Sequence, residues 1–390
     1  MHKLCEIFFD QFDSLAGVVN KMTVLHPSID LPGSKLDIEY LHVGKTSLSL
    51  PFVLDGYVCA IALFAMQNAS LIKVHGPISR AFARNIRLLS EAWACWLPEK
   101  YSVIEIEADK YLDNRKSSLS EKIKAVFGDG RGGGKALSSF SGGADAAFTL
   151  FRHALNGGGL PEAQRFNIED VVMVHGFDVG YDNQEGFDAL RRAVQPVFDK
   201  YEVNCHVVKT NIRNHQVQLW GHSFMAQLSS VLHQFSGGFK YGLVGSSEPY
   251  TNLVNAWGSH PGTDFLLSGD DFEIVHDGAG FSRTEKIFQI GRIDALSDNL
   301  HICWENPEQD RNCGRCEKCI RTKLNFIAAG YEFPRCFDEG LTVEQVQEFR
   351  IVSPVILEEF RSILSFAARN GRSDHPLIHA LNVKISNISF

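Results

Sequence analysis

The feature that most constrains this chain is a regular alternation of strand-like and helix-like segments that begins at Lys135. Short apolar runs are separated by longer stretches in which hydrophobic residues recur with helical spacing. The expected strands and helices are, in order, residues 136–140, 143–155, 171–176, 185–201, 205–211, 215–235 and 241–247. This alternation predicts an α/β fold with a doubly wound parallel sheet. Ligands of such sheets bind at the carboxyl ends of the strands.

The first 127 residues precede this alternation, and we interpret residues 1–127 as a separate mixed α/β domain of unknown role. Clear patterns within it are strands at 70–76 and 101–108 and an amphipathic helix at 80–96. Residues 52–66 are apolar almost throughout, so periodicity cannot decide between a buried strand and a buried helix. After the domain of residues 135–330, we interpret residues 331–390 as a helical extension.

A glycine-rich stretch, residues 127–136, separates the first two parts. Its glycines at positions 128, 130 and 133 have the spacing of a dinucleotide-binding loop, but they precede a strand instead of following one. The Gly-Lys pair that comes next is followed by Ala136, where a phosphate-binding Walker loop has Ser or Thr. We therefore interpret this stretch as a linker.

Composition and charge narrow the class of protein. The 390 residues carry a formal net charge of -8 and no long cluster of Lys and Arg, which disfavours a broad nucleic-acid surface. No apolar run approaches the ~20 residues of a membrane helix, and the first residues do not have the pattern of a signal peptide. Five of the nine cysteines are scattered, which indicates reduced thiols and a cytoplasmic protein.

The first loop of the alternating part has the composition of an anion site. Ser141, Gly142 and Gly143 lie between the first strand and its helix, where backbone N–H groups and the helix N-terminus can face one phosphate. Asp145 falls in the first helical turn, where it can cap the helix or hold Mg²⁺. The alternative is a glycine-rich turn with an aspartate cap and no ligand.

Four cysteines crowd into one short segment and predict a metal site. Cys303 is followed by Cys313, Cys316 and Cys319, and two successive two-residue gaps bring three thiolates to one point. Four thiolates suit a closed, structural Zn²⁺ site, although an iron–sulfur cluster also accepts four cysteines. Neighbouring cations, Arg315, Lys318 and Arg321, can balance the charge of the thiolates.

The segment SFSGGADA, residues 139–146, resembles the Ser-Gly-Gly-x-Asp-Ser signature of the PP-loop ATP pyrophosphatases. The resemblance implies a Rossmann-like fold of the adenine nucleotide alpha hydrolase type, with ATP and Mg²⁺ as cofactors. It implies that ATP is bound by Ser139, Phe140, Ser141, Gly142, Gly143, Ala144, Asp145 and Ala146. The final Ser of the signature is Ala146 here, which removes a phosphate hydrogen bond of about 1–3 kcal/mol.

The order of the loop and the cysteines is similar, over residues 135–330, to the 7-cyano-7-deazaguanine synthases, the QueC-like group of this family. Those enzymes adenylate a carboxylate and pass it to a nitrogen nucleophile. The resemblance implies an adenylating ligase that releases AMP and pyrophosphate, a zinc loop beside the pocket and a homodimer.

Residues after the other strands complete the expected site. His175 and Asp178 follow the second strand, where a base and ribose are commonly bound; the alternative is local hydrogen bonding in the loop. Residues 282–290 resemble a helix start of the family, which implies that Arg283 and Lys286 neutralise phosphate charge. With Asp145 these two cations are the expected catalytic residues. A solvated surface helix is the alternative for both.

The loop after the fourth strand is where the synthases bind their acceptor. The residues expected to bind the acceptor here are Gly245, Ser246, Ser247, His260 and Asp264. No Cys or Arg matches the family's Gly-Tyr-Pro-Asp-Cys-Arg stretch in this loop, so the deazaguanine acceptor is not expected to carry over. His260 is either a proton shuttle or a structural loop histidine.

Two other functions remain open at this stage. Ala146 and the altered acceptor loop fit a nucleotide-binding scaffold that has lost catalysis and acts through a protein partner. The third interpretation is a tRNA-modifying PP-loop enzyme, which the negative net charge of the chain disfavours. The expected acceptor of the enzyme is a small molecule or a protein terminus.

Overall fold

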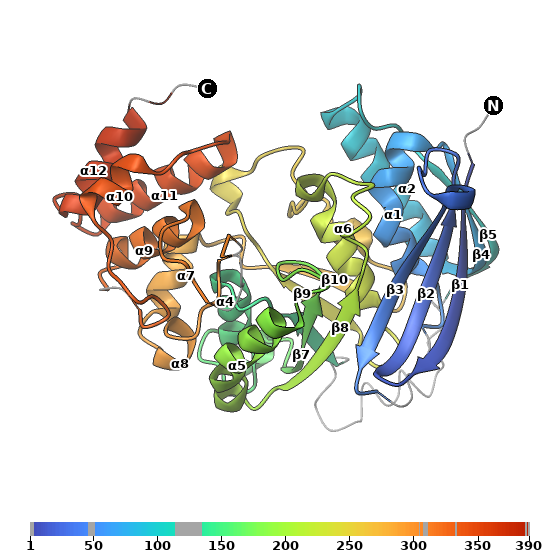
Figure 1. Cartoon of the computed structure of the whole chain (residues 1–390), viewed down its shortest axis with the longest axis horizontal. Coiled ribbons are helices and arrows are strands. Elements are labelled where there is room, and N and C mark those ends of the chain that lie inside the picture. The colour runs from blue at the N-terminus through green and yellow to red at the C-terminus, as the bar shows by residue number, and fades with distance from the viewer. Residues whose placement is uncertain are drawn as a thin grey trace.

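The computed structural model describes residues 4–45, 51–113, 135–303, 305–306, 311–331, 334–386 and 388. The glycine-rich stretch interpreted as a linker lies outside these residues, apart from Lys135 and Ala136. The chain forms an α/β fold around one ten-stranded sheet, in the order β10-β9-β6-β7-β8-β3-β2-β1-β4-β5 (Figure 1). Most neighbouring strands are parallel and the others are antiparallel, so the sheet is mixed.

The second half of the chain contributes five strands that all run parallel. They are β6 (Ala136–Ser139), β7 (Ile168–His175), β8 (Asn204–Thr210), β9 (Tyr241–Gly245) and β10 (Glu273–Asp277). The four strands expected from the sequence are present, and β10 was not foreseen because its run is short. From β6 the chain adds β7 and β8 on one side and β9 and β10 on the other. The order therefore reverses between β6 and β9, as in doubly wound sheets.

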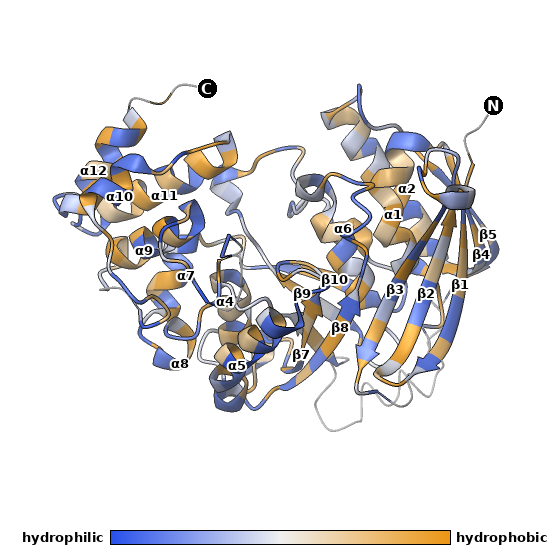
Figure 2. Ribbon diagram, viewed as in Figure 1, coloured by the Kyte–Doolittle hydropathy of each residue, from blue (hydrophilic) through white to orange (hydrophobic). Residues whose placement is uncertain are grey.

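Helices cover both faces of this parallel part. They are α4 (Ala144–His153), α5 (Gln184–Tyr201), α6 (Trp220–His233), α7 (Arg283–Ile290) and the short α8 (Asp294–Ser297). Neighbouring residues of β6 enter different cores, Ala136 with α4 and α5 and Leu137 with α6. This alternation follows from the two-residue period of a strand. Figure 2 shows hydrophobic residues along β7 and β9, whereas α5 carries both hydrophobic and hydrophilic residues.

The expected helix of residues 215–235 begins later, at Trp220. The residues before it are tied to another element, because Gln218 accepts a hydrogen bond from the backbone of Phe64 and donates one to the carbonyl of Ala60. These partners lie in α1 (Asp55–Asn68), and the local pattern could not reveal this contact.

The N-terminal half repeats the strand order of the second half. Its elements are β1 (Leu4–Ser14), β2 (Gly17–Leu25), β3 (Lys35–Val43), α1 (Asp55–Asn68), β4 (Leu71–Ser79), α2 (Arg80–Trp96) and β5 (Glu105–Leu112). Here the first three strands are antiparallel neighbours, while β4 and β5 run parallel to β1. The undecided apolar segment is helix α1, buried on all sides between the sheet and α6, which explains its lack of helical periodicity.

The two halves share their sheet and one core. Strand β3 pairs antiparallel with β8, with Tyr40 opposite Thr210. The core on this face contains residues of α1 together with residues of α6. Within it, Gln234 accepts hydrogen bonds from Asn20 at 2.8 Å and from the hydroxyl of Tyr57 at 3.0 Å. The N-terminal residues are thus continuous with the parallel part.

The last part of the chain is helical and packs beside α7. It comprises α9 (Glu317–Ala328), α10 (Val343–Glu348), α11 (Pro354–Arg369) and α12 (Pro376–Ser386). Helices α9 and α11 both contact α7. Among the described residues, no helix is both long enough and apolar enough to cross a membrane.

Candidate functional site

The glycine loop lies where β6 passes into α4. Gly142 has φ of +82°, and a Cβ there would lie 3.1 Å from His301 and 3.2 Å from Leu190 of α5, so both its conformation and its surroundings favour glycine. Gly143 is the N-cap of α4, and its N–H donates to Ser141 at 3.3 Å. The loop therefore leads directly into the first turn of α4, whose N–H groups have no partner within the helix.

The residues on either side of the loop are held by the protein itself. The Ser139 hydroxyl donates to the carbonyl of Leu243 in β9 at 3.3 Å. Phe140 is buried against Phe198 of α5. Ala146 is only 8 % exposed and belongs to the core that α4 covers. The side chains of Ser139 and Phe140 therefore support the position of the loop, and a ligand would contact these two residues through their backbone.

The three expected catalytic residues meet beside this loop. Asp145 accepts a hydrogen bond from Arg283 at 2.6 Å and another from Lys286 at 2.8 Å, one on each carboxylate oxygen. Burial by itself would raise the pKa of Asp145, but the two cations outweigh it and lower the pKa to about 2. The carboxylate is therefore ionised, and the alternative of a solvated surface helix is wrong for both cations.

Helix α7 presents the two cations because its start is capped. Ser282 and Glu285 form a capping box, each side chain bonding the other's backbone N–H. Arg283 stands at the first helical position, and Lys286, one turn later, is fully buried. Lys286 also donates to the carbonyl of Ser246, which ties α7 to the end of β9.

Two carboxylates that sequence reasoning missed extend this cluster. Glu359 of α11 accepts from Arg283 at 2.8 Å and also pairs with Arg321 of α9. Arg321 pairs in turn with Glu317 at 3.0 Å. Glu359 lies 76 positions beyond Arg283, in a helix with no recognisable motif, so no local signal could have found it.

Gly245, Ser246 and Ser247 adjoin the cluster. A Cβ on Gly245 would lie 2.6 Å from the carbonyl oxygen of Asp145, so β9 and α4 approach each other too closely for any side chain at this position. The Ser246 hydroxyl donates to the carbonyl of Glu248 at 2.6 Å. Ser247 lines a narrow pocket together with Arg283 and Glu359.

His260 and Asp264 lie elsewhere. Asp264 is buried and accepts from the Ser259 hydroxyl and from His276, both at 2.7 Å. The next residue of β10, Asp277, instead accepts from Thr149 of α4. Since successive strand residues point to opposite faces, Asp264 lies on the face away from α4. The structure therefore separates this pair from the other residues expected to bind the acceptor.

His260 itself is held within its loop. Its Nδ1 accepts from the N–H of Gly262 at 3.0 Å, and its ring lies 5.3 Å from that of Trp96 in α2. These contacts match the interpretation as a structural loop histidine.

His175 likewise makes its contacts within the protein. It is buried, stacks on Phe187 with ring centroids 4.5 Å apart, and its Nε2 lies 3.0 Å from the carbonyl of Gly180. Burial lowers its pKa, and Lys209 lowers it further, which keeps the ring neutral. Asp178 is exposed in the same loop at the end of β7.

The four cysteines come together as expected. All four sulfur atoms lie within 4.8 Å of one another, with Cys303 and Cys316 3.9 Å apart, and Cys313 and Cys319 3.9 Å apart. A tetrahedral site with Zn–S bonds of about 2.3 Å places neighbouring sulfur atoms about 3.8 Å apart. Four thiols at this spacing fit a closed Zn²⁺ site, so the donor set and its geometry agree.

Lys323 is a buried cation beside this cluster that sequence reasoning missed. Its ammonium donates to the carbonyls of Gly314 at 2.8 Å and Gly340 at 3.2 Å. Burial lowers the pKa of Lys323, while the surrounding cysteines, Cys319 first, favour its charged form. Arg321 was expected to balance the negative charge of the thiolates, but it forms an ion pair with Glu359 instead.

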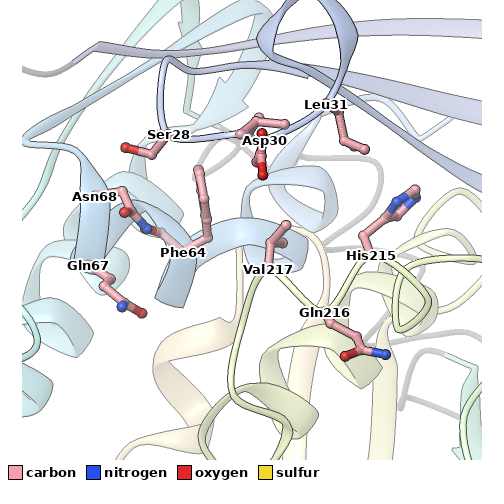
Figure 3. Close-up of a pocket in the computed structure, with 10 residues that line it drawn as sticks. Ser28, Asp30, Leu31, Phe64, Gln67, Asn68, His215, Gln216 and Val217 are labelled. Atoms are coloured by element: carbon pink, nitrogen blue, oxygen red, sulfur yellow. The ribbon is translucent and has the colours of Figure 1, made fainter.

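A larger cavity, of about 280 Å³, lies at the junction of the two halves (Figure 3). Asp30, Asn68 and His215 line it from the loop after β2, the end of α1 and the loop before α6. None of the residues expected to bind a ligand lines this cavity.

Comparisons with known proteins returned nothing: no protein-family model, no curated protein and no solved structure matches the chain.

Proposed function

We propose that the chain is an ATP-dependent adenylating enzyme of the PP-loop type, with an adenine nucleotide alpha hydrolase-like domain and a QueC-like zinc loop. An acceptor carboxylate would attack the α-phosphorus of ATP, which releases pyrophosphate, and a nitrogen nucleophile would then displace AMP. The observation that carries the proposal is that Asp145, Arg283 and Lys286 meet beside the glycine loop. They do so next to the point between β6 and β9 where the strand order reverses, which is where doubly wound sheets bind ligands.

The charges of Asp145, Arg283 and Lys286, together with the helix N-terminus beside them, support this reaction. The N-terminus of α4 offers backbone N–H groups and the positive end of the helix dipole to a pyrophosphate. Arg283 and Lys286 are already fixed by α7, so they would stabilise the charge of the leaving pyrophosphate without reorganising. Asp145 would hold Mg²⁺, which would offset the negative charge of the phosphates.

The cysteine cluster would have a structural role. Four cysteine ligands complete the coordination of Zn²⁺ and leave no open position for a substrate. The cluster precedes α9, whose Asn325 accepts a hydrogen bond from Thr284 of α7 at 2.6 Å. A metal there would hold α9 against the helix that carries Arg283 and Lys286.

Two observations favour a second candidate, a nucleotide-binding scaffold without catalysis. Both oxygens of Asp145 are engaged by cations, and Ala146 lacks the hydroxyl of the family signature. Such a site could bind ATP and fail to consume it.

Calorimetric titration of MgATP into the zinc-loaded protein tests the proposal. We expect the intact protein to bind ATP and Asp145→Ala to lose binding, while Asp199→Ala, which removes an exposed carboxylate from α5, binds normally. AMP release with candidate carboxylate acceptors and ammonium then separates enzyme from scaffold. Absence of ATP binding in the intact protein, or unchanged binding in Asp145→Ala, would overturn the proposal.

A further inference from the structure

We propose that the cavity at the junction of the two halves binds a small organic cation, an alkylguanidinium or alkylammonium group on a short carbon chain. Its volume of about 280 Å³ far exceeds the roughly 10–15 Å³ that holds one water molecule, so an organic molecule fits. Three segments line it: the loop after β2, the last turn of α1 and the loop before α6 (Figure 3). It shares no lining residue with the narrow pocket beside Arg283, so the inference does not depend on the proposed function.

Two polar side chains of the cavity keep a hydrogen-bond acceptor for a ligand. The Nδ2 of Asn68 donates to the carbonyl of Phe64 at 3.0 Å, so the amide oxygen of Asn68 remains an acceptor. The Nε2 of His215 lies 3.0 Å from the carbonyl oxygen of Asp37, and because a carbonyl only accepts, this nitrogen carries the hydrogen. Burial lowers the pKa of His215, which keeps the ring neutral and leaves Nδ1 as an acceptor. Both side chains thus spend a donor on the protein and offer an acceptor.

The charges around the cavity favour a cation as the ligand. Asp30 contributes a carboxylate, and no Lys or Arg is found among the described residues that line the cavity. Phe64, Gln67 and Asn68 belong to the last turn of α1, which contains no basic residue. The carbonyl groups at the end of a helix carry the negative end of its dipole. The carboxylate and the helix end together attract a positive group and repel an anion.

The apolar part of the lining indicates that the cation carries carbon. Ile29, Leu31, Phe64 and Val217 line the cavity beside the polar groups, and Ile29 and Phe64 are each only 3 % exposed. Side chains of this kind cover methylene groups of a ligand, whereas the few polar groups orient its head. A bare metal ion is disfavoured, because the four cysteines are the only group of three or more metal-ligating side chains among the described residues.

The protein holds the three lining segments in place without a ligand. In the loop after β2, the Nδ1 of His26 accepts from the N–H of Ser28 at 3.0 Å, and the N–H of Ile29 donates to the carbonyl of His26 at 3.0 Å. The loop before α6 is tied to α1, because Gln218 accepts from the N–H of Phe64 at 3.0 Å. The cavity is therefore formed in advance, as is usual for small-molecule sites.

Calorimetric titration of the full-length, zinc-loaded protein with butylguanidinium or butylammonium chloride, at constant ionic strength and without ATP, tests the inference. We expect saturable binding of at least one of these cations and none of sodium butyrate or 1-butanol, which have the same carbon chain without the positive charge. The tighter cation identifies the head group. The Nα-acetyl methylamide of arginine or lysine then identifies the source: equal affinity indicates a side chain of a peptide, and lost affinity indicates a free small molecule.

Asp30→Asn is expected to weaken binding of the cation about tenfold, because a neutral amide replaces the charged acceptor. The matched control Asp109→Asn removes an exposed carboxylate from β5, outside the cavity, and should bind like the intact protein. Ser28→Phe should abolish binding by filling the cavity while leaving its charge unchanged. Ser28 and Asp30 are both exposed, so we expect the two variants to fold.

Three results would overturn the inference: no binding of either cation, binding of butyrate or butanol as tight as that of the cations, or an undiminished affinity in Asp30→Asn. Because the assay contains no ATP and changes no residue of the site around Asp145, its outcome is separate from that of the ATP titration. Each of the two sites can therefore be contradicted without the other.

Discussion

At the level of single residues, Asp145 is the carboxylate on which both cations of the site converge. Its side chain is 19 % exposed, and that of Lys286 is fully buried. Removing the negative charge leaves Arg283 and Lys286 with one carboxylate between them, in Glu359. The residue thus couples the stability of the fold to the charge of the site.

We expect Asp145→Asn to lower the free energy of unfolding by about 3 kcal/mol near neutral pH, because it breaks a buried ion pair on one side only. The folded pKa, about 2, lies below the ordinary value of 3.8, so the carboxylate stabilises the fold above the ordinary value and loses this effect as pH falls toward 2. Urea titrations from about pH 7 to about pH 3 should show the difference from the intact protein shrinking below about pH 4. A constant difference would contradict this.

Ala146 occupies the position where the family signature has a hydroxyl. We expect Ala146→Ser to bind MgATP about tenfold more tightly, because one hydrogen bond to a charged phosphate contributes about 1–3 kcal/mol. Calorimetric titration measures this change, with Ala147→Ser, one position further along α4 in the core, as the control. Unchanged or weaker ATP binding in Ala146→Ser would mean that the position does not face the phosphates.

At the level of elements, the site depends on the close approach of β9 to the first turn of α4. Gly245 allows it, since any Cβ would lie 2.6 Å from the Asp145 carbonyl. Helix α7 then reaches across both elements, through the contacts of Lys286 with Asp145 and with the Ser246 carbonyl.

We expect Gly245→Ala to destabilise the protein by about 1–3 kcal/mol and to weaken ATP binding, because β9 and α4 must move apart. The matched control is Gly280→Ala, at an exposed glycine whose added Cβ would meet nothing within 4 Å. Urea denaturation and calorimetric titration measure the two effects. Equal behaviour of the two variants would show that the close approach does not support the site.

At the level of the whole molecule, the cysteine cluster and the C-terminal helices brace the site from outside the sheet. The cluster precedes α9, and α9 and α11 supply Arg321 and Glu359 to the network around Arg283. The stability of this part and the geometry of the site are therefore linked.

We expect the purified protein to contain about one zinc ion per chain, and a strong chelator to lower both its melting temperature and its ATP affinity. Cys316→Ser should reproduce both losses, whereas Cys95→Ser, at an exposed cysteine outside the cluster, should reproduce neither. Metal analysis, thermal unfolding and calorimetry measure these outcomes. A metal-free protein of normal stability would contradict the assignment.

The sequence alone determined the features that neighbouring residues specify. The alternation after Lys135 indicated the strands β6 to β9 and their helices, because burial on two faces leaves a local pattern. The spacing of Cys313, Cys316 and Cys319 indicated the four-cysteine cluster, because two-residue gaps return the chain to one point. Resemblance to a family motif assigned Asp145 and Arg283 to one expected site, and the structure adds that they bond each other.

Only the tertiary structure decided what depends on contacts between distant segments. The pairing of β3 with β8 joins the halves in one sheet, and nothing in either strand specifies its partner. Burial between the sheet and α6 makes α1 a helix without periodicity. The face of the sheet on which Asp264 lies, and the arrival of Glu359 at Arg283, likewise depend on how the whole chain packs. Long-range packing selects among arrangements that local patterns leave equal, and it alone placed Glu248 and Glu359 at the same pocket.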